Sequence, residues 1–135
     1  MRYIVLDTNC LLQILPSTSP FHKIWTDILF GKISLCVSTS ILEEYEEVLG
    51  KKITPDFANQ ILETITHLST TTYQNSYVSF NLIYSDPDDN KFVDCAIASN
   101  AEYIVSNDKH YNILKNIQWP KIKVVNVVEF TKQLA

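Results

Sequence analysis

The chain has 135 residues, which is enough for one domain with a substantial buried core. It is 46% hydrophobic and contains only two glycines, which excludes a flexible linker or a low-complexity sequence. A formal net charge of −4 argues against binding nucleic acid through a simple basic patch, but it leaves open a phosphate partner that is approached through bound cations. The first apolar run is interrupted by Asp7 and is too short for a signal peptide or a membrane span. We therefore expect a cytoplasmic protein with no membrane association.

The first third of the chain alternates between one strand and two helices. Residues 3–6 form a continuous apolar run, typical of a strand that is buried on both faces of a parallel sheet. A short helix is predicted at residues 9–15. A second helix is predicted at residues 20–30, with Gly31 as its stop.

The middle of the chain repeats this order. Residues 33–37 predict a second strand, and Ser38-Thr-Ser40 predicts the cap of a helix that runs to about Leu49. Gly50 is the predicted stop of this helix, and a further helix is predicted at residues 55–68.

Residues 69–85 are the least clear stretch, with a composition that indicates extended chain and either an edge strand or a partner-binding loop. A helix should follow from Asp86, as its N-cap, through Pro87 to about Asn100. Residues 103–105 then predict a third buried strand.

Residues 123–128 predict a fourth strand, and a short helix closes the chain. Strands that alternate with helices indicate a three-layer α/β/α fold around a central, mainly parallel sheet of four to five strands. We expect residues 1–135 to form a single domain of this kind. Because ligands of such sheets bind beyond the carboxyl ends of the strands, candidate site residues are sought there.

Two aspartates follow predicted strands. Asp7 comes directly after the first strand, where an unpaired charge beside a buried strand would be costly. An aspartate that merely caps the next helix is the alternative. Asp108 follows the third strand within Ser-Asn-Asp-Lys, and taken singly it reads as a turn residue.

Four glutamates lie in the helix that follows the second strand. Ser40 and Glu43 form an S-x-x-E capping box, which is a sufficient structural role for Glu43. At about 100° per residue, Glu43 and Glu47 point toward solvent, whereas Glu44 and Glu46 flank the apolar face. Glu44 is preferred because it lies in the first turn, nearest the first strand, and Glu46 is the fallback. An ordinary solvated helix face is equally compatible with these residues.

Three aspartates lie in the next predicted helix. Asp89 falls near the centre of the apolar face, where a carboxylate is costly unless it meets donors or a metal. Asp88 has an adequate role as a first-turn acid. Asp94 points about 140° away from Asp89, although an error of one residue in the helix phase would bring it into contention. Asp89 is therefore the preferred third acid.

Asp7, Glu44, Asp89 and Asp108 thus occupy equivalent positions, at strand ends or in the first turns of the following helices. Crowded carboxylates repel one another unless cations bind. Oxygen-rich clusters suit Mg²⁺ or Mn²⁺ rather than zinc. The three histidines share no ligand spacing, so none is assigned to a metal.

Four segments together resemble PIN-domain proteins, in particular the branch described as toxin components of toxin–antitoxin systems. They are Val-Leu-Asp-Thr-Asn9, Ser-Ile-Leu-Glu-Glu-Tyr-Glu-Glu-Val-Leu49, Asp-Pro-Asp-Asp-Asn-Lys-Phe92 and Ala-Glu-Tyr-Ile-Val-Ser-Asn-Asp108. The resemblance implies a metal-dependent endoribonuclease that hydrolyses RNA, with the same four acids as catalytic metal ligands. Ser106 stands where the family commonly has threonine or serine. A homodimer and an antitoxin partner are also implied.

Weaker signals concern the RNA path. Lys51, Lys52, Lys109, His110 and Lys115 are candidates to line it, with Tyr111 available to stack on a base, although solvated side chains are the simpler interpretation. Trp25 and Trp119 are expected to be packing residues. The alternative function is a catalytically silent PIN-fold module that binds RNA or protein. Retention of all four acids argues against it, because an inactive site has no reason to keep buried carboxylates.

Overall fold

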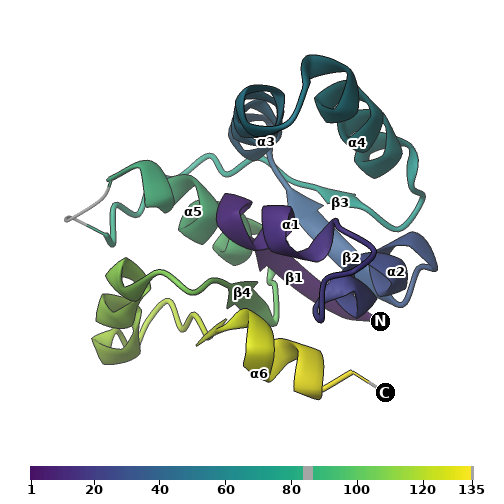
Figure 1. Ribbon diagram of the computed structural model, residues 1–135. Coiled ribbons are helices and arrows are strands. Elements are labelled where there is room, and N and C mark those ends of the chain that lie inside the picture. The colour runs from purple at the N-terminus through teal and green to yellow at the C-terminus, as the bar shows by residue number, and fades with distance from the viewer. Residues whose placement is uncertain (84–86, 135) are drawn as a thin grey trace.

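A single five-stranded sheet, with every pair of neighbouring strands parallel, forms the centre of the molecule (Figure 1). The computed structural model describes residues 1–83 and 87–134. The strand order is β3-β2-β1-β4-β5, so the chain starts in the middle of the sheet and builds outward in both directions. The strands are β1 (Arg2–Leu6), β2 (Ile33–Val37), β3 (Thr72–Tyr73), β4 (Tyr103–Val105) and β5 (Val124–Val125). The predicted fold class is confirmed.

Helices cover both faces of this sheet and complete the three layers. The α-helices are α1 (Thr8–Ile14), α2 (His22–Leu29), α3 (Thr39–Lys52), α4 (Pro55–His67), α5 (Asn90–Ser99) and α6 (Val127–Lys132), and the 3₁₀ segments are η1 (Pro87–Asp89) and η2 (Lys109–Asn116). In Figure 1, α1 lies in front of β1, and α5 lies on the other side of the sheet. From β1 the chain adds strands on one side of the sheet as far as β3, and then adds β4 and β5 on the other side of β1. Because crossovers between parallel strands are right-handed, this change of side places the connecting helices on opposite faces.

The core is densest around the two central strands. Ile4, Val5 and Leu6 of β1 are fully buried, and so are all the residues of β2. Tyr45 on α3 donates a hydrogen bond of 2.6 Å to the carbonyl oxygen of Leu6. This bond ties α3 to the carboxyl end of β1 and satisfies a strand-end carbonyl that burial would otherwise leave unpaired. The position of α3 relative to β1 is therefore fixed at the carboxyl edge of the sheet.

Two predicted features of α3 are wrong. Within the predicted cap Ser38-Thr-Ser40, Ser38 is the N-cap, and its hydroxyl accepts a hydrogen bond from the Ile41 amide at 3.3 Å, whereas Ser40 lies inside the helix. The capping box proposed for Glu43 therefore does not form. Gly50 does not end the helix, which continues to Lys52, since two lysines in the last turn favour its C-terminal dipole.

The second helix was predicted more accurately at its end than at its start. Helix α2 begins at His22, two residues later than predicted. Gly31 follows the helix with φ +77°, a left-handed conformation that glycine adopts without strain. A Cβ there would also lie 3.2 Å from Thr70.

The last predicted strand is shorter than expected. Of residues 123–128, only Val124 and Val125 pair with β4. The Asn126 side chain accepts a hydrogen bond of 2.8 Å from the amide of Glu129 and thereby starts α6. The capping energy of this asparagine overrides the β propensity of the valines that follow it. The η2 segment was not predicted.

Residues 69–85 contain only one short strand in the part that the structure describes, β3, which lies at the edge of the sheet beside β2. The predicted N-cap, Asp86, lies outside the described residues. From Pro87 onward a 3₁₀ turn leads into α5, which ends at Asn100 in the left-handed conformation. Among the described residues, no helix is both long and apolar enough to cross a membrane.

Candidate active site

The carboxyl end of β1 carries a buried acid, Asp7. Asp7 follows Leu6 directly, and only 7% of its surface is exposed. One carboxylate oxygen accepts a hydrogen bond of 3.4 Å from the amide of Asn9 and so caps α1. This is the purely structural role that the sequence had offered as the alternative for Asp7. The other oxygen accepts a hydrogen bond of 2.7 Å from the hydroxyl of Ser106, beyond the end of β4. Capping therefore accounts for only one side of this carboxylate.

Burial raises the pKa of Asp7, and the hydrogen bonds from Ser106 and Asn9 oppose that rise. The negative charges of Asp108 and Glu44 raise the pKa of Asp7 further. These three acids come from three distant segments of the chain, and yet they are close enough to interact. A positive counter-charge at this place would therefore stabilise the ionised cluster.

Glu44 links three elements. The helix begins at Thr39, so Glu44 lies in the second turn of α3 rather than the first. One of its oxygens accepts a hydrogen bond of 2.7 Å from Lys91 on α5, and the other accepts one from the hydroxyl of Thr8 on α1. The fallback residue Glu46 is exposed. Lys91 had not been singled out from the sequence, and its position two residues after Asp89 was the one available signal.

Asp89 and Asp108 meet around a histidine. Nδ1 of His110 lies 2.9 Å from a carboxylate oxygen of Asp108 and 3.9 Å from one of Asp89. One ligand atom from each of the three residues lies within 4.8 Å of the others, a spacing that a single metal ion can bridge. Spacing along the sequence gave His110 no metal role, because Asp89 lies 21 residues before it in the chain. The fold therefore brings an imidazole beside two of the predicted acids, which sequence spacing could not reveal.

Asp94 faces a different part of the molecule. It is half-buried on α5, and it accepts a hydrogen bond of 3.1 Å from the backbone amide of Phe80. Burial raises the pKa of its carboxyl group. The geometry thus joins Asp89, rather than Asp94, to Asp108 and His110. The catalytic role of either aspartate stays a prediction.

A buried tyrosine marks the point where all four acids come together. Tyr111 is 1% exposed, so it cannot stack on an RNA base, and that prediction is wrong. Burial raises the pKa of its hydroxyl well above the usual value, and so do the charges of Asp7, Asp89, Asp108 and Glu44. Within the described residues this hydroxyl has no hydrogen-bond partner. The charges of all four predicted acids therefore act on one buried hydroxyl.

The donor set at this position fits a divalent cation. It is dominated by carboxylate oxygens with a single imidazole, which suits Mg²⁺ or Mn²⁺ better than a zinc site built on thiolates and several histidines. Burial raises the pKa of Asp7, and the charges of Asp108 and Glu44 add to this rise, so a bound cation would favour its ionised form. Lys91 offsets part of the charge of Glu44.

The weaker candidates have mixed outcomes. Lys109 and Lys115 line a hollow of about 240 Å³ that also includes Asp108, whereas Lys51 is paired with Glu47 on the exposed side of α3. Trp25 is buried, as predicted for a packing residue. Trp119 is 82% exposed, so the same prediction is wrong for it.

Fold and site together define a parallel α/β protein with a carboxylate cluster at the carboxyl edge of its sheet. The family described as "PIN domain" matches residues 3–110, and the chain belongs to the PIN-domain family. This confirms the family resemblance seen in the sequence. No curated protein matches the chain.

Among solved structures, the chain is similar to one described as VapBC2 from Rickettsia felis bound to a DNA fragment from their promoter. The TM-score is 0.59 and the sequence identity is 18%, over 92% of this chain and 98% of that chain. At this identity the similarity establishes a shared fold over nearly the whole length of both chains.

Proposed function

We propose that this protein is a metal-dependent endoribonuclease that hydrolyses phosphodiester bonds of RNA. The observation that carries the proposal is the grouping of Asp89 and Asp108 with His110, together with the charges of Asp7, Glu44, Asp89 and Asp108 that all act on buried Tyr111, in a chain of the PIN-domain family. Four carboxylates that interact at one buried position lower the stability of the apoprotein. A divalent cation bound by these carboxylates would offset their repulsion and could act on a phosphate group.

Asp7, Glu44, Asp89 and Asp108 would hold one or two Mg²⁺ or Mn²⁺ ions, and His110 lies where it can join Asp89 and Asp108. When bound, such an ion lowers the pKa of an attacking water and offsets the charge that develops on the phosphate.

The remaining residues of the site orient these acids. Ser106 holds one oxygen of Asp7 by its 2.7 Å hydrogen bond, so the carboxylate cannot rotate freely. Thr8 and Lys91 fix both oxygens of Glu44. Lys91 also places a positive charge beside the cluster, where it can attract an RNA phosphate. Outer partners of this kind commonly contribute about 10- to 100-fold to metal affinity or activity.

The toxin role belongs to the same proposal. It rests on the family resemblance and on the shared fold with a VapBC2 structure. An antitoxin protein and a second copy of this chain are the proposed partners, in the cytoplasm. The competing function is a silent PIN-fold module that binds RNA or protein without cutting it.

Cleavage of an end-labelled, mixed-sequence single-stranded RNA separates these two functions. We expect cutting with Mg²⁺ or Mn²⁺, none with EDTA, and a loss of at least about 100-fold in Asp7→Asn, since a ligand should matter more than its outer partners. Asparagine is a good N-cap, so α1 should be preserved in this variant. Equal cleavage by Asp7→Asn would overturn the assigned site. RNA that is bound but left intact with both metals would favour the silent module.

A further inference from the structure

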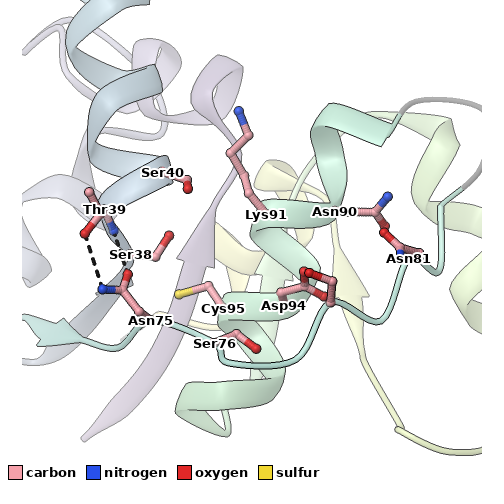
Figure 2. Close-up of a pocket in the computed structure, with 11 residues that line it drawn as sticks. Ser38, Thr39, Ser40, Asn75, Ser76, Asn81, Asn90, Lys91, Asp94 and Cys95 are labelled. Atoms are coloured by element: carbon pink, nitrogen blue, oxygen red, sulfur yellow. Dashed lines mark hydrogen bonds between the residues drawn. The ribbon is translucent and has the colours of Figure 1, made fainter.

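A polar cavity of about 470 Å³ lies between the start of α3 and α5 (Figure 2). The start of α3, the loop of residues 74–83 and one side of α5 form its walls. Hydroxyl and amide side chains make up most of the lining. The volume is within the usual range for small-molecule sites, about 300–1,000 Å³.

The cavity meets the candidate active site at Lys91. Lys91 lines it and also donates the 2.7 Å hydrogen bond to Glu44. Ser40 lines it too, and borders a neighbouring hollow that contains Glu44. A ligand in this cavity would therefore lie beside Lys91, one hydrogen bond away from Glu44.

The loop wall of the cavity is held in place by side-chain hydrogen bonds to α3 and α5. They join the Thr39 amide to Asn75 (3.0 Å), the Phe80 amide to Asp94 (3.1 Å), and both backbone polar groups of Ile83 to Asn90 (2.9 Å each). The cavity is thus formed before any ligand arrives, which reduces the ordering cost of binding.

Several polar groups of the lining are available to a ligand. The side chains of Ser40, Ser79 and Asn81 make no hydrogen bond within residues 1–83 and 87–134. Asn81 has φ +51°, a left-handed conformation that asparagine tolerates better than most residues. Behind them, burial raises the pKa of Cys95 to about 12, so its thiol stays neutral. The lining therefore offers mainly uncharged donors and acceptors.

We propose that this cavity binds one unpaired nucleoside of the RNA substrate, with Ser40 and Asn81, which lie on facing sides of the cavity (Figure 2), hydrogen-bonded to opposite edges of its base. The inference rests on the nuclease function proposed above. An amide presents both a donor and an acceptor, as base edges do, and sequence-specific RNA recognition mostly uses such unstacked bases. The lining contains one lysine and one carboxylate, Asp94, so it is a poor match for a second phosphate. The backbone of the bound nucleotide would pass Lys91 toward the acids.

The test compares two labelled ten-residue oligomers, one of mixed-sequence single-stranded RNA and one of the same length without bases. Binding is measured by fluorescence anisotropy in Ca²⁺, and cleavage of the same RNA is measured in parallel in Mn²⁺. The variant is Ser40→Ala with Asn81→Gly, because alanine suits a helix and glycine suits a positive φ. Asn59→Ala is the matched control, since Asn59 is an exposed amide on α4, away from the cavity.

We expect the double variant to bind the RNA roughly tenfold more weakly, as the loss of two ordinary hydrogen bonds predicts, and to bind the baseless oligomer as wild type does. Asn59→Ala should match wild type with both. Equal weakening on both oligomers would overturn the proposal, because the cavity would then contact the backbone. Unchanged RNA binding in the double variant, or no RNA binding by wild type, would also overturn it. Wild-type cleavage in Mn²⁺ reports separately on the nuclease function, so the two failures are distinguishable.

Discussion

The two edges of the sheet handle charge in opposite ways. At the amino edge, Arg2 donates hydrogen bonds of 2.6 Å to both Glu102 and Gln133, and its guanidinium lies 4.9 Å from the centre of the Phe130 ring. The positive charge of Arg2 is therefore matched by one carboxylate, one side-chain amide and one aromatic ring. At the carboxyl edge, four acids interact around Tyr111, and Lys91 pairs with one of them.

Stability explains the amino edge and fails to explain the carboxyl edge. The contacts of Arg2 tie β1, the start of β4 and the end of α6 together, which is a structural role. At the carboxyl edge, burial raises the pKa of Asp7, and the negative charges of Asp108 and Glu44 raise it further. A cluster of mutually repelling acids lowers the stability of the folded protein, so a structural role does not account for it. The excess of acid at this edge is therefore the strongest sign of function among the described residues.

The largest predicted effect concerns metal binding at the carboxyl edge. Saturating Mn²⁺, at about 100 times its dissociation constant, should stabilise wild type by about 2.7 kcal/mol and raise its Tm by roughly 10 °C. Asp89→Asn should lose most of this rise, because Asp89 is grouped with Asp108 and His110. Asp94→Asn should keep the rise, because Asp94 faces Phe80 instead. Thermal melts with Mn²⁺ and with EDTA measure both.

A reversed result would be informative. If Asp94→Asn lost the Mn²⁺ response and Asp89→Asn kept it, the third acid would be Asp94, which was the alternative that helix phase left open. If neither variant changed the response, the ion would bind elsewhere, and the contrast between the two edges would lose its functional meaning.

The sequence predicted the sheet well because buried parallel strands leave an unambiguous signal. Residues 3–6 and 33–37 are apolar runs with clear ends, and both form strands within one residue of the prediction. Residues 123–128 carried a conflicting signal, since Asn126 with a glutamate three positions later also matches a helix start. The Asn126 cap determined that α6 starts there, and this helix-start pattern was visible in the sequence.

The acids could be proposed from the sequence because each is adjacent to an element end. Their partners could not be proposed in the same way. The Lys91–Glu44 contact joins residues 47 apart, and it depends on how α3 and α5 approach each other. The group of Asp89 with His110 depends likewise on where η2 lies, and that segment was not predicted. Propensity and periodicity describe single elements, so contacts between elements lie beyond them.

The second prediction concerns Asp7 without metal. In EDTA near pH 7, Asp7→Asn should be more stable than wild type by about 1–2 kcal/mol, the usual gain on relieving a destabilised active site. The neutral amide removes a buried charge and its repulsion from Asp108 and Glu44. Melts of both proteins in EDTA measure the difference. Lower stability in the variant would mean that the hydrogen bonds of Asp7 outweigh its charge.

The third prediction is the matching change at the amino edge. Arg2→Met keeps much of the apolar stem but removes the ion pair and the cation–π contact. We expect a loss of about 1 kcal/mol, because an exposed ion pair and an exposed cation–π contact each contribute at most about 1 kcal/mol. Denaturant melts measure it. The loss should be the same with EDTA and with Mn²⁺, and a metal-dependent loss would show that the two edges are coupled.

The smallest effect, and the most specific, is the pH dependence of the difference between Asp7→Asn and wild type. Burial raises the pKa of Asp7 in the folded protein above its ordinary value of 3.8. The folded state therefore holds the proton more tightly than the unfolded state, and wild type loses stability as the pH rises from that ordinary value through the raised pKa. The variant has no such proton to lose. Melts in EDTA between about pH 4 and pH 8 should show a difference in Tm that is small at the acidic end, grows with pH, and levels off once Asp7 is ionised. A difference that stays constant over this range would assign the stabilisation to packing or hydrogen bonding instead of charge, and the carboxyl edge would then resemble the amino edge after all.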